Sequence, residues 1–101
     1  MITKMIKIYV LEGCDKCKKL KSTLDKLNIK YNCITCEESP NACDQIESIT
    51  GVDMYPIVDL GKNVLYIAEK YNDVGKKKEV NGYNTLGFYS IDNIIEFVKK
   101  D

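Results

Sequence analysis

Apolar and polar positions change their period several times along the chain. Residues 5–11 alternate and are rich in β-branched and aromatic side chains, which predicts a strand. Residues 14–27 instead place apolar side chains at helical spacing with lysines and acids between them, which predicts an amphipathic helix. The same patterns predict the remaining elements: strands at 29–35, 56–60 and 64–67, and helices that begin at Ser39-Pro40 and after Ser90.

The order of these elements, β-α-β-α-β-β-α, predicts an α/β fold. A strand, a helix and a strand in succession imply a right-handed crossover and a parallel pair. The turn Gly61-Lys62-Asn63 joins the last two strands, so we expect an antiparallel hairpin there. Residues 68–86 are polar and have no steady period, which indicates a long loop insertion. A mixed four-stranded sheet with helices on both faces satisfies every element, and we expect one domain over residues 1–101.

Composition excludes several classes of function. Lysines and acidic residues number 15 each and the net charge is zero, so no basic excess points to nucleic acid. The chain contains neither arginine nor histidine, which excludes Ser-His-Asp and Cys-His catalysis and His-ligated metal or haem. No apolar stretch is long enough for a signal peptide or a membrane span, so we expect a cytoplasmic protein with reduced thiols. The chemistry is therefore expected to rest on cysteine.

The motif Cys14-Asp15-Lys16-Cys17 stands where the first strand passes into the first helix. Free N–H groups and the helix dipole at that place stabilise a thiolate and lower a cysteine pKa below its free value of about 8.5. Lys16 adds positive charge and so tunes the site, whereas Asp15 opposes the effect. Cys17 lies on the apolar stripe, so we expect it to be shielded while Cys14 is exposed. Half of a zinc site, or two unreactive thiols, are the alternatives to this nucleophile and resolving thiol.

The chain has three further cysteines, Cys33, Cys36 and Cys43, for a total of five. An odd number argues against a closed disulfide framework. Cys33 and Cys36 would point to opposite faces of a strand and pair poorly there. Three interpretations stay open for these cysteines: small buried hydrophobic residues, a regulatory disulfide, or a metal site formed by all three.

The segment Met54-Tyr55-Pro56 precedes the third strand, where a proline is tolerated. Together with the CxxC motif and the order of elements, it resembles a glutaredoxin, a member of the thioredoxin superfamily, over residues 5–67 and 86–99. The resemblance implies that Cys14 is the nucleophile and Cys17 the resolving cysteine. Pro56 is similar to the family's cis-proline, and the backbone of Tyr55 would bind an incoming thiol peptide like an added strand.

Residues 87–93 resemble the segment with which glutaredoxins hold the γ-glutamyl end of glutathione. The resemblance implies that Ser90 and Asp92 bind glutathione, together with free N–H groups of the same segment. The dipeptide between the two cysteines is Asp15-Lys16, where the family usually has Pro-Tyr.

The leading hypothesis is a thiol–disulfide oxidoreductase that reduces protein disulfides or glutathione mixed disulfides through its CxxC dithiol. It implies no bound cofactor and no metal, with glutathione as a co-substrate. The reductant could be either glutathione or a thioredoxin reductase, and the motif does not decide between them. We expect the protein to be a monomer. The alternative is a non-enzymatic thioredoxin-fold binding module that uses Tyr55, Pro56 and the 68–86 loop, or a cysteine-based metal carrier.

Overall fold

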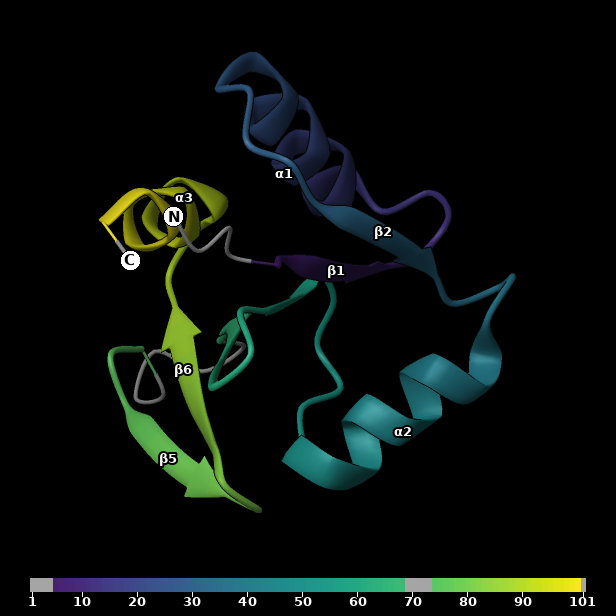
Figure 1. Cartoon of the computed structure of the whole chain (residues 1–101), viewed down its shortest axis with the longest axis vertical. Coiled ribbons are helices and arrows are strands. Elements are labelled where there is room, and N and C mark those ends of the chain that lie inside the picture. Colours follow the sequence, from purple (N-terminus) through teal and green to yellow (C-terminus); the bar gives the residue numbers. More distant parts are fainter. Residues whose placement is uncertain (1–4, 69–73, 101) are drawn as a thin grey trace.

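A computed structural model describes residues 5–68 and 74–100 (Figure 1). It contains a six-stranded sheet with the strand order β2-β1-β3-β4-β6-β5. The strands are β1 (Lys7–Val10), β2 (Asn32–Thr35), β3 (Ile57–Asp59), β4 (Asn63–Ile67), β5 (Lys77–Val80) and β6 (Tyr83–Phe88). The helices are α1 (Asp15–Lys26), α2 (Pro40–Thr50) and α3 (Ile91–Lys100). Of these three helices, none has the length and apolarity to cross a membrane.

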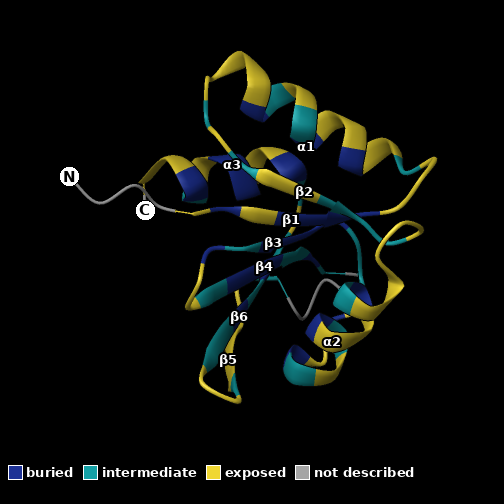
Figure 2. Cartoon of the chain, turned by 45° about the vertical axis from the view of Figure 1, so that its right-hand side comes forward, coloured by how far each residue is buried: buried dark blue, intermediate teal, exposed yellow. Residues whose placement is uncertain are grey.

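The sheet separates two apolar clusters. Figure 2 shows α1 and α3 on one face and α2 on the other. Neighbouring residues of β1 supply both clusters, because side chains alternate between the faces of a strand. Ile8 packs into the larger cluster with α1 and α3, and Tyr9 packs into the smaller cluster with α2.

The helix boundaries follow the capping signals in the sequence. The Cys14 sulfur accepts a hydrogen bond from the N–H of Cys17 at 3.2 Å and thereby caps α1. Proline begins α2, and Gly51 ends it with φ +75°, a left-handed conformation that glycine adopts without steric cost. These positions agree with the predicted helices.

The expected four strands are an undercount, and the predicted 68–86 loop is wrong for its second half. Residues 77–80 form β5, and residues 83–86 belong to β6. Every residue of β5 up to Glu79 is exposed, so this edge strand shows no hydrophobic period that a sequence pattern could reveal. The signal that we missed is Asn81-Gly82, which has positive φ at both residues and pairs Val80 with Tyr83 across a two-residue turn.

The β5–β6 hairpin extends the sheet beyond β4 and does not alter the pairing of the strands that precede it. Strands β1 and β2 are parallel, and β3 and β4 form an antiparallel hairpin, as the pattern predicts. Strand β3 also pairs with β1, in the antiparallel direction. Strand β6 runs parallel to β4, with Ile67 beside Phe88. It therefore delivers the chain to the same end of the sheet at which β4 finishes. Helix α3 starts from that end, where β1 also leads into α1 and β3 begins.

Candidate active site

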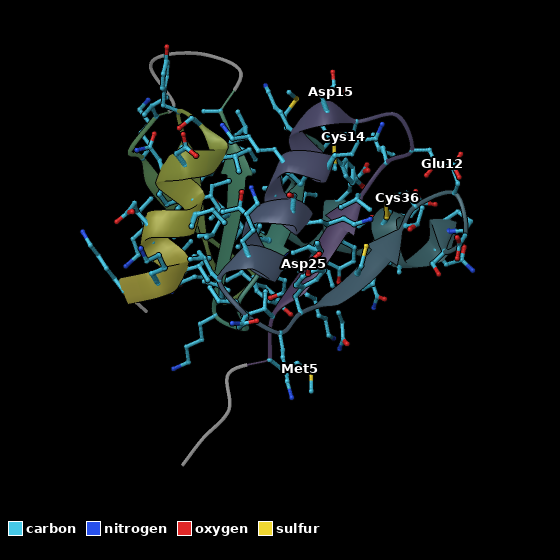
Figure 3. All side chains as sticks on the ribbon, turned by 90° about the horizontal axis from the view of Figure 1, so that it is seen from above. Met5, Glu12, Cys14, Asp15, Asp25 and Cys36 are labelled. Atoms are coloured by element: carbon cyan, nitrogen blue, oxygen red, sulfur yellow. A yellow bond between two sulfur atoms is a disulfide. The ribbon has the colours of Figure 1, made fainter. Side chains whose placement is uncertain are left out.

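Cys14 and Cys17 form a disulfide at the start of α1, with their Cα atoms 5.2 Å apart. Cys14 is half-buried, whereas Cys17 is 3% exposed and belongs to the larger apolar cluster. Cys14 is therefore the more accessible of the two cysteines, as the helical spacing predicts. Asp15 and Lys16 lie exposed on the first turn of α1, and Figure 3 shows Cys14 and Asp15 at one end of the molecule.

Tyr55 and Pro56 lie at the start of β3. Ile57 pairs with Tyr9 of β1, so the two residues before it lie near the point where the chain leaves β1 for Cys14. The peptide bond between Tyr55 and Pro56 is cis, as the resemblance implies, and Pro56 is fully buried. Tyr55 and Cys14 both pack against the larger apolar cluster.

The hydroxyl of Tyr55 donates a hydrogen bond to a carboxylate oxygen of Glu47, on α2. Burial of the phenol raises the pKa of Tyr55, and the bond to Glu47 and the charges of Glu47, Asp44 and Asp53 raise it further. Glu47 was not among the residues that the sequence analysis selected. It lies beside the apolar stripe of α2, and no local pattern links it to a residue eight positions further along the chain.

Ser90 and Asp92 lie at the start of α3 and have partners within the protein. The hydroxyl of Ser90 accepts the N–H of Asn93 at 3.3 Å and donates to its side-chain oxygen at 2.9 Å, so Ser90 caps the helix. The carboxylate of Asp92 forms an ion pair with Lys19 of α1, with a nitrogen–oxygen distance of 3.5 Å. The first turns of α1 and α3 are therefore neighbours on the same face of the sheet.

A cavity of about 430 Å³ lies between β6 and α3, where Phe88 and Phe97 meet edge to face. Tyr89 and Asn93 also line it, so it borders the segment that resembles a glutathione site. Neither Cys14 nor Tyr55 lines this cavity.

A second disulfide joins Cys36 to Cys43, with their Cα atoms 5.6 Å apart. Cys33 is free and exposed. The interpretation of all three as small buried residues is therefore wrong, and so is a metal site that needs three thiolates from them. Of the open interpretations, the disulfide agrees with the structure. No three metal-ligating side chains cluster within residues 5–68 and 74–100.

The spacing of cysteines could not have identified this pair from sequence alone. Cys36 follows β2 in a turn rather than within the strand, and Cys43 lies in the first turns of α2. The turn folds back because the N–H groups of Glu38 and Ser39 both donate to the carbonyl of Thr35, at 3.0 and 2.9 Å. That tertiary geometry brings the two cysteines together.

A comparison with solved structures supports the fold. The thioredoxin-like protein BC3987, in the crystal structure of a mutant, matches with a TM-score of 0.57 and 17% sequence identity. The match covers 92% of this chain and 97% of that chain. At this identity the likeness concerns the fold alone. The comparison with curated proteins found no significant match.

A comparison with family models identifies the family. The glutaredoxin family model matches residues 6–65, more than half of the chain. This region contains β1, α1, β2, α2 and β3 with the CxxC motif and the cis-proline, whereas β5, β6 and α3 follow it. The protein thus has a thioredoxin-like α/β fold with a mixed sheet, and the chain belongs to the glutaredoxin family.

Proposed function

We propose that this protein is a thiol–disulfide oxidoreductase that reduces protein disulfides or glutathione mixed disulfides through Cys14 and Cys17. The observation that carries the proposal is the CxxC pair at the start of α1, in which a half-buried sulfur is joined to a buried one. The cis-proline segment at the same end of the sheet and the family match support the same activity.

Cys14 acts as the nucleophile in its thiolate form. The N–H of Cys17 already points at the Cys14 sulfur, and the N-terminus of α1 favours negative charge there. The thiolate attacks one sulfur of the substrate disulfide, which releases the other sulfur as a thiolate and leaves a mixed disulfide on Cys14. Cys17 then attacks Cys14, releases the second substrate thiolate and closes the intramolecular disulfide.

Two segments at the end of the sheet where α1 begins bind the substrate. The backbone of Tyr55, held by cis-Pro56, pairs with an extended substrate peptide as an added strand. Ser90 and Asp92 at the start of α3 bind the γ-glutamyl group of glutathione, for which the exposed carboxylate of Asp92 supplies the charge. Lys16 tunes the reactivity of the two cysteines through its positive charge.

The cycle needs a reductant and no metal or flavin on this chain. Glutathione is the co-substrate that the family suggests. A thioredoxin reductase is the other candidate, because residues 87–93 match the glutathione segment only loosely. The cytoplasm is the compartment that keeps both systems reduced. The physiological partners are then protein disulfides, which the protein meets as a monomer.

A coupled assay of NADPH consumption tests the proposal. One reaction contains glutathione and glutathione reductase, a second contains thioredoxin reductase, and both contain a small disulfide as acceptor. We expect turnover in at least one reaction and its loss in Cys14→Ser, with Cys33→Ser as the matched control. Turnover only with thioredoxin reductase would assign that reductant. No turnover in either reaction would contradict the enzyme and favour the binding module or the metal carrier.

A further inference from the structure

The disulfide Cys36–Cys43 lies outside the CxxC motif, and the proposed reaction does not use it. We infer that Cys36–Cys43 is a second thiol–disulfide couple, reduced by small neutral dithiols through Cys36, whose oxidised form holds Tyr55 in position for protein substrates. The inference about Tyr55 rests on the proposed function.

The two disulfides share one arrangement. In each, a half-buried cysteine near the start of a helix is joined to a cysteine that lies within the helix and is 3% exposed. Cys36 corresponds in this respect to Cys14, and Cys43 to Cys17. Thiol–disulfide exchange requires an in-line approach to an accessible sulfur. Cys36 is therefore the sulfur that a reductant attacks, and Cys43 is the leaving group.

The reduction balances with a dithiol as the reductant. One thiolate of the dithiol attacks Cys36, breaks the Cys36–Cys43 bond and releases Cys43 as a thiolate. The second thiolate then attacks the mixed disulfide, releases Cys36 as a thiolate and leaves the reductant as a cyclic disulfide. Two electrons pass to the protein, and the two new thiolates become thiols with protons from the buffer or the dithiol.

The charges around the two disulfides differ. Glu37 and Glu38 follow Cys36, and Asp44 follows Cys43; all three are exposed and acidic. The exposed residues next to the CxxC motif are mixed, with Lys16, Lys18 and Lys19 against Glu12 and Asp15, and Glu12 donates its N–H to the Glu37 carboxylate at 3.2 Å. An anionic thiol such as glutathione is therefore repelled more strongly from Cys36 than from Cys14, and salt weakens the difference. We expect glutathione to reduce Cys14–Cys17 first, and a neutral dithiol to reduce both pairs.

The disulfide is one of the contacts that hold the first turns of helix α2. The helix buries only Cys43, Ile46 and Thr50. Cys43 ties its first turns to the segment after β2, which is in turn held to β1 by a hydrogen bond of 2.9 Å from the Cys36 N–H to the Val10 carbonyl. Without the bond between the sulfurs, the first turns of α2 keep only their apolar contact with the sheet, whereas the end of the helix is still held by a hydrogen bond of 2.6 Å from the Asn81 side chain to the Ile49 carbonyl.

Glu47 transmits the position of α2 to the candidate substrate site. It lies one turn after Cys43 and accepts the hydrogen bond from the hydroxyl of Tyr55, the residue before cis-Pro56. The contacts therefore run from Cys36 through Cys43, α2 and Glu47 to Tyr55. When Cys36–Cys43 is reduced, we expect Tyr55 to lose this support. Helix α1 lies on the other face of the sheet from α2, and Cys17 stays packed in the larger apolar cluster there (Figure 2).

The redox couple is tested first, without any assay of activity. The oxidised protein is incubated with glutathione or with dithiothreitol, new thiols are alkylated, and the modified cysteines are mapped by mass spectrometry. We expect Cys14 and Cys17 to be modified with either reagent, and Cys36 and Cys43 faster with dithiothreitol than with glutathione, the difference shrinking in high salt. A pair that resists dithiothreitol in the folded protein would overturn the couple.

The link to Tyr55 is tested by exchange and by kinetics. Cys36→Ser/Cys43→Ser is compared with Cys33→Ser, which removes the free exposed thiol. We expect faster amide hydrogen exchange at residues 53–57 and a KM for a protein disulfide raised at least about fivefold, with kcat for a small disulfide unchanged. Glu47→Ala, which leaves the disulfide intact, is expected to raise the same KM. Unchanged exchange and KM in both variants would overturn the link.

These outcomes separate the two proposals. If the wild-type protein turns over no disulfide, the proposed function fails, while cysteine mapping and hydrogen exchange still decide whether Cys36–Cys43 is a couple that holds residues 53–57. If the wild-type protein is active and only the mapping fails, the second couple is overturned and the CxxC chemistry stands.

Discussion

Lys19 of α1 and Asp92 of α3 form an ion pair whose nitrogen and oxygen atoms lie 3.5 Å apart. The pair links the helix that starts with the CxxC motif to the segment that resembles a glutathione site. Both side chains are more than half exposed, so the pair contributes about 0–1 kcal/mol to stability. The exposed carboxylate is accessible to a charged ligand.

Asp92→Asn separates a role in binding from a role in stability. We expect a higher KM for glutathione with an almost unchanged melting temperature, because the lost ion pair is a weak one. The assay is the glutathione-coupled reaction with thermal denaturation in parallel. Glu96→Gln is the matched control, since Glu96 pairs with Lys99 on the same helix at 3.8 Å. An equal change of KM in both variants would remove Asp92 from the glutathione site.

Ser90→Ala tests whether the cap of α3 stabilises the fold. The Ser90 hydroxyl accepts the N–H of Asn93, and loss of such a cap costs about 1 kcal/mol. We expect the melting temperature to fall by about 4–8 °C for a chain of this size. Ser48→Ala, at an exposed position within α2, is the control. A melting temperature equal to that of the control would show that the cap contributes nothing.

Gly82→Ala tests the turn that the sequence pattern did not reveal. Gly82 has φ +86°, where an alanine side chain costs roughly 1–2 kcal/mol. We expect the midpoint of urea unfolding to fall by a corresponding amount, while the alkylation rate of Cys14 stays the same. Lys78→Ala, at an exposed position of β5 in the same hairpin, is the control. A stable Gly82→Ala variant would contradict the two-residue turn.

The stability of the fold at alkaline pH depends on Tyr31. Burial first, and then the hydrogen bond of 3.0 Å to Asp25, raise the pKa of Tyr31 from its ordinary value of 10.0 to about 12. The folded protein therefore ionises this phenol later than the unfolded chain does. Its contribution to stability is full below pH 10 and is lost as the pH rises through about 12.

Tyr31→Phe measures this contribution by urea unfolding at several pH values. We expect a stability difference from the wild-type protein that is constant below pH 10 and shrinks above it. Tyr89→Phe serves as the control, since Tyr89 is 71% exposed. A difference that stays constant up to pH 12 would contradict the raised pKa.

The sequence predicts the part of the fold in which burial imposes a period. The stripes of α1 and α2 and the apolar strands β1, β3 and β4 follow from that period, and the CxxC motif follows from its place between β1 and α1. Strand β5 does not, because an edge strand with exposed lysines buries almost nothing. Its only local signal is the chemistry of the turn Asn81-Gly82.

The tertiary contacts of the site are beyond the reach of such patterns. The bond between Cys36 and Cys43 depends on how the turn after β2 folds back on α2, and the contact of Glu47 with Tyr55 depends on how α2 packs on the sheet. The placement of Ser90 and Asp92 near α1 depends on β6 running parallel to β4. Each is a relation between elements, whereas hydrophobic period reports one element at a time.

The attack of Cys14 on a disulfide is the central claim, and trapping the mixed disulfide tests it most directly. Cys17→Ser removes the resolving thiol, so a covalent adduct with a protein disulfide such as insulin should accumulate and should map to Cys14. Cys14→Ser should form none. An adduct at the exposed Cys33, or no adduct in Cys17→Ser, would contradict the assignment of Cys14 as the nucleophile.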